Sequence, residues 1–321
     1  MSTDPRVAIT GGGITALTAA AELARRGHRV DVFDKARGPG GRTSVRRAEV
    51  AGRPIVFNHG CAVFEATDPE FRNAVEAWKQ AGVATAFAGR AVLIDGDGVT
   101  EDPTRFVTGT PAINAIAKHL AATPGVTFHP KHHVTEAGSG RLAFQDQPAI
   151  DGFDAIVLTC PAPQVPAIVG EAHPDLAAKV ESVTMRPTWA AMVAWESDEA
   201  DFGLAHVRRG PIERLIRAGD GAWAVHLTHD FSEQFLEARP EEIAAEAARH
   251  VAAVLGMTQP PAHRVAHRWR FVTTPTPVGM PCLSEENGRF VVAGDWLLGD
   301  GVEAAWRSGT AGATRVAEAL S

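Results

Sequence analysis

Residues 7–34 read VAITGGGITALTAAAELARRGHRVDVFD, and this stretch decides the fold of the chain. Its apolar start, residues 7–9, predicts a short buried strand, and the three glycines that follow predict a tight turn. The Ala- and Leu-rich residues 14–26 predict a helix, and residues 30–33 predict a second strand that ends in an acid. Strand, glycine turn, helix and strand in this order are typical of a Rossmann-type α/β domain.

The glycine turn is suited to a close approach to phosphate. Gly11 and Gly13 let the backbone turn sharply and bring N–H groups near a pyrophosphate at the positive end of the helix. Ala16 stands at the third fingerprint position, where the helix needs only to pack closely on the strand. Asp34, about 20 residues further on, is placed to accept hydrogen bonds from a ribose diol. We therefore predict nucleotide contacts at Gly11, Gly13, Ile14, Thr15, Ala16, Asp34 and Lys35.

A second glycine-rich turn follows the second strand, because residues 37–42 read RGPGGR. A domain that binds only NAD does not need this turn. FAD continues past the pyrophosphate into a ribityl chain and a large ring, and it requires another close backbone approach. We therefore predict FAD at Gly40, Gly41 and Arg42; the alternative is a surface loop with solvated arginines.

The composition is that of an ordinary globular protein. The 321 residues are 45% hydrophobic and 21% charged, which suffices for two domains or for one domain with a long insertion. A net charge of -7 argues against nucleic acid as the main partner, because phosphate binding needs clustered Lys and Arg. The chain does not open with a signal-peptide pattern and contains no apolar run long enough to span a bilayer, so we expect a cytoplasmic protein without membrane contact.

Metal and phenol chemistry are not expected. Cys61, Cys160 and Cys282 are widely spaced, which indicates neither a disulfide framework nor a zinc site. The HxxHH pattern of residues 129–133 would scatter its rings to different faces of a strand, so we predict no metal. Tyrosine is absent, so any proton donor must be another group.

The central part of the chain changes pattern. Extended segments such as 192–195 and 223–227, followed by a helix pattern over 240–255, predict an antiparallel sheet with a helix beside it. We predict a substrate domain formed by residues 61–103 and 166–275. The FAD-binding domain is then formed by residues 1–60, 104–165 and 276–321.

Several segments together carry a resemblance to a known family. They are VAITGGGITAL (7–17), VFDKARGPGGRTSVRR (32–47), FNHGCAVFEATDPEF (57–71), TGTPAINAIAKHLA (108–121), AIVLTCPAPQ (155–164), AHRWRF (266–271) and VVAGDWLLGDGVEAAWRSG (291–309). Over nearly its whole length the chain resembles renalase-like FAD-dependent oxidoreductases, relatives of the flavin amine oxidases. The resemblance implies a Rossmann-type FAD-binding domain of the glutathione reductase-like family of flavoproteins, with an inserted α+β substrate domain.

The C-terminal segment adds a third predicted contact with the cofactor. Residues 290–293 predict a strand leading into Gly294 and Asp295, and a helix opens at Val302. The resemblance implies that Asp295 bonds the ribityl chain or a phosphate, and that the helix presents N–H groups to the flavin. It also implies that the backbone at Val134 contacts the adenine. The cofactor residues implied in this way are His59, Gly60, Val134, Gly294, Asp295, Val302 and Glu303.

The stretch from 57 to 64 departs from the family pattern, in which an acid, an amide and a phenol stand at the positions of Asn58, Ala62 and Val63. These changes predict a more apolar pocket and leave room for a different substrate. His59 is the one titratable group that the resemblance places near the flavin ring. It is a catalytic candidate, with an orienting or pKa-tuning role. Trp269 and Trp296 are either core residues or an aromatic wall for the substrate.

Three functions remain open from the sequence. The resemblance implies non-covalent FAD that takes a hydride on N5 from unusual dihydro isomers of NAD(P)H and passes electrons to O2, giving H2O2. The second function keeps FAD but oxidises an amine or a small apolar metabolite. The third is a nucleotide-binding or flavin-sensing module without turnover.

Overall fold

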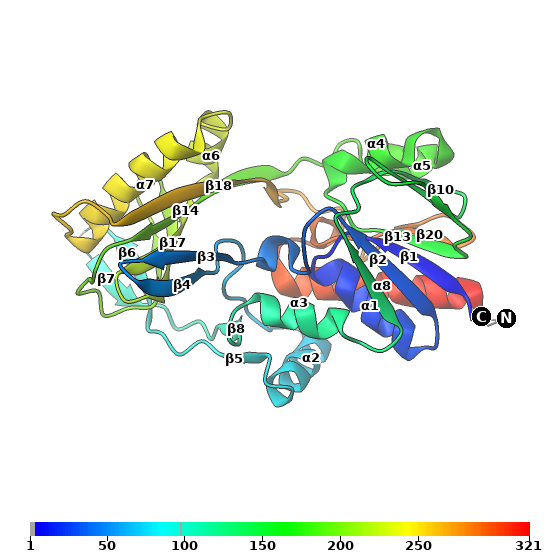
Figure 1. Ribbon diagram of the computed structural model, residues 1–321, viewed down its shortest axis with the longest axis horizontal. Helices are drawn as coiled ribbons and strands as arrows, with labels where there is room; N and C mark the ends of the chain where they lie inside the picture. The colour runs from blue at the N-terminus through cyan, green and yellow to red at the C-terminus, as the bar shows by residue number, and fades with distance from the viewer. Residues whose placement is uncertain (1–3, 97) are drawn as a thin grey trace.

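Two units, each built on one β-sheet, make up the computed structural model, which describes residues 4–96 and 98–321 (Figure 1). The first unit holds a six-stranded sheet that is parallel except for one edge strand. Its strands, in spatial order, are β19 (Leu283–Ser284), β20 (Phe290–Val292), β13 (Ala155–Leu158), β1 (Arg6–Thr10), β2 (Arg29–Asp34) and β9 (Val126–Pro130).

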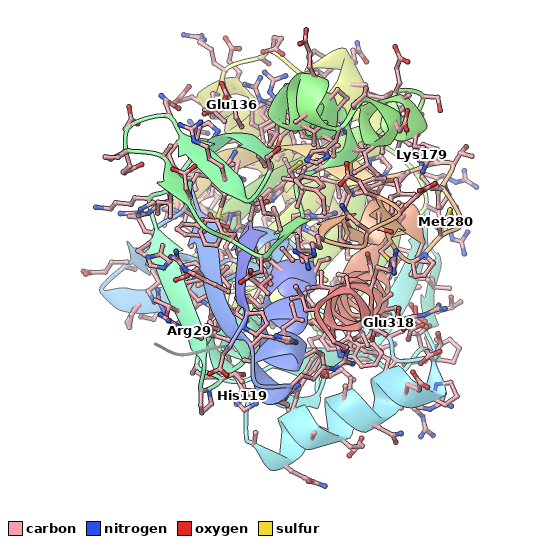
Figure 2. All side chains as sticks on the ribbon, turned by 90° about the vertical axis from the view of Figure 1, so that its right-hand side faces the viewer. Arg29, His119, Glu136, Lys179, Met280 and Glu318 are labelled. Carbon is pink, nitrogen blue, oxygen red and sulfur yellow. The ribbon has the colours of Figure 1, made fainter. Side chains whose placement is uncertain are left out.

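Apolar side chains cover both faces of this sheet, as expected for parallel strands. One face packs against α1 (Ile14–Arg25), α2 (Pro69–Gln80), α3 (Asn114–Ala121) and α8 (Gly301–Leu320). The other face packs against β10 (Val134–Gly138), β11 (Arg141–Phe144), β12 (Ile150–Asp151), α4 (Val165–Val169) and α5 (Pro174–Val180). Figure 2 views the layers from the end of α8 at Glu318, with Glu136 and Lys179 on one side of the sheet and His119 on the other.

Helices α1 and α8 run parallel and in close contact. A Cβ at Gly309 would collide with the carbonyl oxygen of Thr15 and lie 3.0 Å from Cβ of Thr18. Further along, Arg26 Nη2 donates a hydrogen bond to Thr314 Oγ1 at 3.1 Å. Both helices therefore begin at the edge of the sheet where the parallel strands end, which is where open α/β sheets bind ligands.

The second unit is built on a seven-stranded sheet in which all neighbours are antiparallel except β15 and β6. The strands, in order, are β18 (His263–Thr273), β14 (Arg186–Ala194), β17 (Ala222–Leu227), β16 (Ile212–Gly219), β15 (Leu204–Val207), β6 (Ala91–Asp95) and β7 (Gly98–Glu101). Helices α6 (His229–Gln234) and α7 (Pro240–Leu255) cover one face, and the hairpin of β3 (Arg46–Val50) and β4 (Arg53–Phe57) packs on the other. A short pair, β5 (Ala84–Ala86) and β8 (Val107–Gly109), completes the strands.

The predicted mixed α/β architecture, with a Rossmann-like unit on a parallel sheet, is confirmed. Helix α7 has the predicted bounds, because Pro240 suits its first turn and Gly256 ends it at a φ of +66°. The domain boundaries stay a prediction, but some elements pack across them. Helices α2, α4 and α5 join the cores of the first unit, and the β3–β4 hairpin joins the core of the second. Local patterns do not reveal which of two cores an apolar face will meet.

Within residues 4–96 and 98–321, no helix combines the length and the apolar character needed to cross a bilayer.

Candidate functional site

The first glycine turn lies where β1 ends and α1 begins. Gly11 has a φ of +97°, and a Cβ there would lie 2.5 Å from Oγ1 of Thr159, so a side chain is excluded. At Gly13 a Cβ would meet no atom within 4 Å, so the turn faces open space. Among the described residues no side chain caps α1, and its first N–H groups are therefore available to an anion.

Asp34 closes this turn from the end of β2. Its Oδ1 accepts a hydrogen bond from the N–H of Ala36 at 2.5 Å, and a Cβ at Gly12 would lie 2.6 Å from its Oδ2. Burial raises the pKa of Asp34, although hydrogen bonds from the backbone of Ala36 and Gly12 oppose the rise. The carboxylate is thus fixed at the turn, and Lys35 beside it is exposed. The ribose role of Asp34 stays a prediction.

The chain before Val134 is tied to the same edge. The N–H of His132 donates to the carbonyl of Asp34, and the N–H of Lys131 to that of Ala36, both at 2.9 Å. Val134 follows as the first residue of β10 and is 8% exposed. This places its backbone near the end of β2, and its contact with adenine stays a prediction.

The two glycine turns pack directly against each other. The N–H of Gly40 donates to the carbonyl of Gly12 at 2.7 Å. Gly41 has a φ of +53°, and a Cβ there would lie 2.9 Å from Cα of Gly13. Both glycines of the second turn therefore serve a close backbone approach, beside the open space in front of Gly13.

An ion pair joins the second turn to the C-terminal segment. Arg42 Nη2 lies 2.5 Å from Asp295 Oδ1, and Arg42 Nη1 donates to the carbonyl of Val272 on β18 at 2.8 Å. The side chain of Asp295 is 4% exposed. Nearby, Asp300 accepts from the N–H of Thr274 at 3.0 Å. The ion pair thus lies where the second turn, the segment before α8 and the second unit meet.

The segment His59–Cys61 runs between Arg42 and the large sheet. The N–H of Cys61 donates to the carbonyl of Arg42 at 2.8 Å, and a Cβ at Gly60 would collide with that carbonyl. The indole N–H of Trp269 donates to the carbonyl of His59 at 3.2 Å, and their rings stack with centroids 5.3 Å apart. The structure therefore brings together four residues predicted for the site: Arg42, His59, Gly60 and Trp269.

The imidazole of His59 is a neutral group at physiological pH. Burial, followed by the nearby His267 and the charge of Arg46, lowers the pKa of His59 to about 4. Its Nδ1 is buried and forms no well-aligned hydrogen bond in the described part of the chain, although a weak interaction with the backbone of Phe57 opposes the fall in pKa. An unpaired buried ring nitrogen can serve a bound molecule as donor or acceptor, depending on the tautomer.

His226 is a neighbour of this site that the sequence prediction missed. Its Nε2 lies 3.3 Å from the carbonyl oxygen of His59, and burial together with Arg214 lowers its pKa to about 3. The available signal was the alternation along residues 222–227, which puts it on the same face as Ala222 and Ala224. That pattern does not say what the face meets.

Trp296 does not form a substrate wall, and that alternative is wrong. It is 1% exposed, and its indole N–H donates to the carbonyl of Cys160 at 3.1 Å. Its ring belongs to the core between the six-stranded sheet and α4. A side chain with almost no accessible surface cannot touch a substrate, so Trp296 is a core residue.

The side chain of Glu303 is engaged elsewhere than at a cofactor. Its carboxylate accepts from the N–H of Thr67 at 2.6 Å, from the hydroxyl of Thr67 at 2.7 Å and from the N–H of Asp68 at 3.1 Å. It fixes the entry to α2, whose N-cap is Asp68. Val302 beside it is 3% exposed in the first core, so only the backbone of this turn remains for the predicted flavin contact.

In the altered run of residues 58–63, the prediction that Ala62 and Val63 make the pocket more apolar is wrong. Ala62 is 2% and Val63 4% exposed, and both pack in the core beneath the β3–β4 hairpin. Asn58 Oδ1 accepts from the N–H of Ile113 at 3.3 Å. The side chains of Ala62 and Val63 therefore belong to the core and do not line a pocket, whereas Asn58 is half-buried.

Cys282 lies away from this junction. Its neighbours include Arg315, which is about 20 Å along α8 from the start of the helix at 1.5 Å per residue. Burial raises the pKa of its thiol, which makes it a poorer nucleophile. Its position supports the expectation of a non-covalent cofactor.

Comparison with known proteins agrees with this geometry. Residues 9–80 match the NAD(P)-binding Rossmann-like domain family. A candidate protoporphyrinogen oxidase from Exiguobacterium sp. 255-15 has a similar structure, with a TM-score of 0.74 and 14% identity, covering 100% of this chain and 99% of its own. The protein PF1083 from Pyrococcus furiosus superposes with a TM-score of 0.67 and 11% identity over 97% of both chains. At such identities the likeness establishes a shared fold.

Proposed function

We propose that this chain is an FAD-dependent oxidoreductase of the renalase type, within the glutathione reductase-like flavoproteins, working in the cytoplasm. The observation that carries the proposal is the junction of Arg42, Asp295 and Cys61. It joins the three segments that the sequence assigned to FAD at one edge of the parallel sheet. A domain for NAD alone does not require the second turn and the C-terminal segment to meet there.

The described residues fit FAD. The open space at Gly13 and the uncapped start of α1 suit a pyrophosphate, and Asp34 suits the adenosine ribose. The second turn and Asp295 lie beyond that point, where the ribityl chain would continue. Bound FAD would supply a two-electron acceptor for a hydride and a route for those electrons to O2, which becomes H2O2.

The chain itself contributes position and electrostatics. The neutral imidazole of His59 offers a hydrogen bond without adding a positive charge, and Trp269 supplies an aromatic surface beside it. A dihydronicotinamide donor gives up a hydride and has no acidic proton to remove. Among the residues that the structure describes, the carboxylates of Asp295 and Asp300 are already bonded to other groups, and none is free near His59 to pair with a cationic amine. This arrangement suits a dihydronicotinamide donor better than a cationic amine.

The proposed donors are therefore dihydro isomers of NAD(P)H. The alternative of an amine or a small apolar metabolite depended on Ala62 and Val63, and their burial removes its motivation. A module without turnover stays an outcome of the experiment.

The test is anaerobic reduction of the bound flavin. Purified protein is expected to carry FAD that acid precipitation releases, and stoichiometric dihydronicotinamide isomers are expected to bleach it. Admitted O2 should restore the colour with one H2O2 per donor. Bleaching by amines alone would transfer the function to amine oxidation, and flavin that dithionite but no organic donor reduces would indicate a module without turnover. As a check on the nucleotide site, Asp34→Ala should lower the FAD retained on dialysis.

A further inference from the structure

A row of basic side chains crosses the face of the seven-stranded sheet that meets His59. Arg214 on β16 pairs directly with His206 on β15 and with His226 on β17. Ala190 on β14 then pairs with both His226 and His267. Because directly paired residues point to the same face, the four side chains form one row, here called the basic row. It consists of His206, Arg214, His226 and His267.

The contacts of the row fix which way it faces. Two positions along their strands, Leu204, Ile216 and Ala224 lie on the same face and pack in the core beneath the β3–β4 hairpin. At the row itself, the ring of His267 lies 5.1 Å from that of His59. The basic row therefore looks toward the 59–61 segment, on the side where the two units meet.

Arg214 forms no direct ion pair with a described carboxylate. Within residues 4–96 and 98–321 its guanidinium makes no hydrogen bond or ion pair, and its Nε is buried without a partner. Two other partly buried arginines are paired, Arg42 with Asp295 and Arg217 with Asp198. A buried guanidinium N–H without an acceptor is costly, so the unpaired Nε of this half-buried side chain points to a bound anion.

One carboxylate lies near enough to offset part of this charge, but it does not contact Arg214. This carboxylate, Asp102, accepts from the N–H of Thr104 and lies 3.8 Å from His206 Nε2. Hydrogen bonds from Thr104, followed by the charges of His206 and Arg214, lower its pKa. Burial and then Arg214 lower the pKa of both His206 and His226. The histidines of the row thus stay neutral and leave the positive charge on Arg214.

A second unpaired arginine flanks the row. Arg46 on β3 is exposed and has no ion pair with any residue that the structure describes. It lies close enough for its charge to lower the pKa of His59 and His267, after the effect of burial. Two arginines without an ion pair among the described residues converge on one face in a chain whose net charge is -7.

We propose that Arg214, assisted by Arg46, binds an anionic group of the electron donor, a carboxylate or a phosphate. The inference rests on the proposed function, because it places the donor beside His59, on the face of the large sheet that carries the basic row. The planar guanidinium offers paired N–H groups that match two oxygens of such an anion, and the neutral histidines can donate further hydrogen bonds. The anionic group would then be a specificity determinant of the donor, separate from the carbon that is oxidised.

The test measures binding of two probes, inorganic phosphate and benzoate, to the flavin-loaded protein by titration calorimetry. We expect one of them to bind with a stoichiometry of one. Arg214→Gln should weaken that binding at least about tenfold, and Arg214→Lys should restore part of it, because it keeps the charge without the planar fork. Arg46→Gln should weaken it less. Arg209→Gln is the matched control, since Arg209 is exposed and paired with Asp95; it should change nothing.

The outcomes separate the sources of the anion. Saturation by phosphate alone assigns the group to a nucleotide phosphate, and saturation by benzoate alone assigns it to an organic carboxylate. The proposal is overturned if neither probe saturates, or if Arg214→Gln binds as the parent does. Should Arg214→Gln fail to fold, the Arg214→Lys and Arg46→Gln affinities decide, with unchanged affinity in both counting against the proposal.

Calorimetry detects the anion without turnover, so the two proposals can fail separately. Flavin that no donor reduces would refute the proposed function while leaving the phosphate and benzoate affinities meaningful. Rapid reduction by a donor, with affinity unchanged in Arg214→Gln, would refute only the anion site.

Discussion

Breaking the ion pair between Arg42 and Asp295 should loosen both the fold and the hold on the cofactor. Asp295→Asn keeps the shape of the side chain but removes the charge that faces Arg42 Nη2 at 2.5 Å. Loss of one partner of a fully buried pair costs about 3 to 5 kcal/mol. The Arg42 side chain is 33% exposed, so water screens part of this, and we expect about 2 kcal/mol. At about 2 °C per kcal/mol for a chain of this size, Tm should fall by about 4 °C.

A double-mutant cycle isolates the pair from other effects of each substitution. The assay is urea unfolding followed by circular dichroism, with the flavin content of each variant measured after dialysis. The variant carrying both Arg42→Met and Asp295→Leu should lose less stability than the sum of the single variants, by about 1 to 2 kcal/mol, because it leaves no unpaired buried charge. Two results together would refute the reasoning that this pair joins the cofactor segments: stability losses of the single variants that sum to that of the double variant, and a flavin content in Asp295→Asn equal to that of the parent.

Three further changes test other parts of the site. Gly41→Ala should cost more than the about 1 to 2 kcal/mol of its left-handed φ, because its Cβ would also lie 2.9 Å from Cα of Gly13, and it should lower the FAD content. Gly82→Ala, strained at a φ of +72° but facing open space, should cost only about 1 to 2 kcal/mol and keep the parent's FAD content. Glu303→Gln should lower the free energy of unfolding by about 1 kcal/mol through weaker hydrogen bonds to Thr67, and flavin absorbance after dialysis should not change. The pKa of His59 is about 4 in the folded protein and 6.5 when unfolded, so the unfolded chain binds more protons between these values and stability falls as pH drops through this window. His59→Phe should remove this loss of stability, which is worth about 2 kcal/mol at pH 5. If the free energy of unfolding of variant and parent changes with pH in parallel, the lowered pKa of His59 is not the cause.

The sequence predicts those features whose causes are local. The first strand, glycine turn and helix follow from hydrophobic period and from glycine geometry within a few residues, and the structure confirms them. The bounds of α7 follow for the same reason, from Pro240 at its start and Gly256 at its end. Each of these signals acts within one element, so no knowledge of tertiary packing is required.

The partners of charged and aromatic side chains could not be predicted in the same way. Arg42 and Asp295 are 253 positions apart, and nothing near either residue names the other. The sequence alone does not distinguish the environments of Trp296 and Trp269. In the structure Trp296 is enclosed by the core, whereas Trp269 lies beside His59. Glu303 follows a predicted cofactor segment, but the loop before α2 takes its carboxylate. The partner that each of these side chains contacts depends on how the two units pack, which is a global property of the chain.

The arginines on the two sides of the junction differ in whether they have an ion-pair partner. This difference bears on how the protein would select its electron donor. In the first unit, Arg42 is matched by a buried carboxylate, so its charge is already used in holding segments together. In the second unit, Arg214 and Arg46 lack such a partner among the described residues, while the imidazoles of His59 and His226 between them stay neutral. A charge that the protein does not compensate is available to attract a ligand, whereas a neutral imidazole can only orient one. Changes at the two unpaired arginines should therefore act mainly on donor affinity, and changes at the histidines mainly on the rate of flavin reduction once the donor is bound.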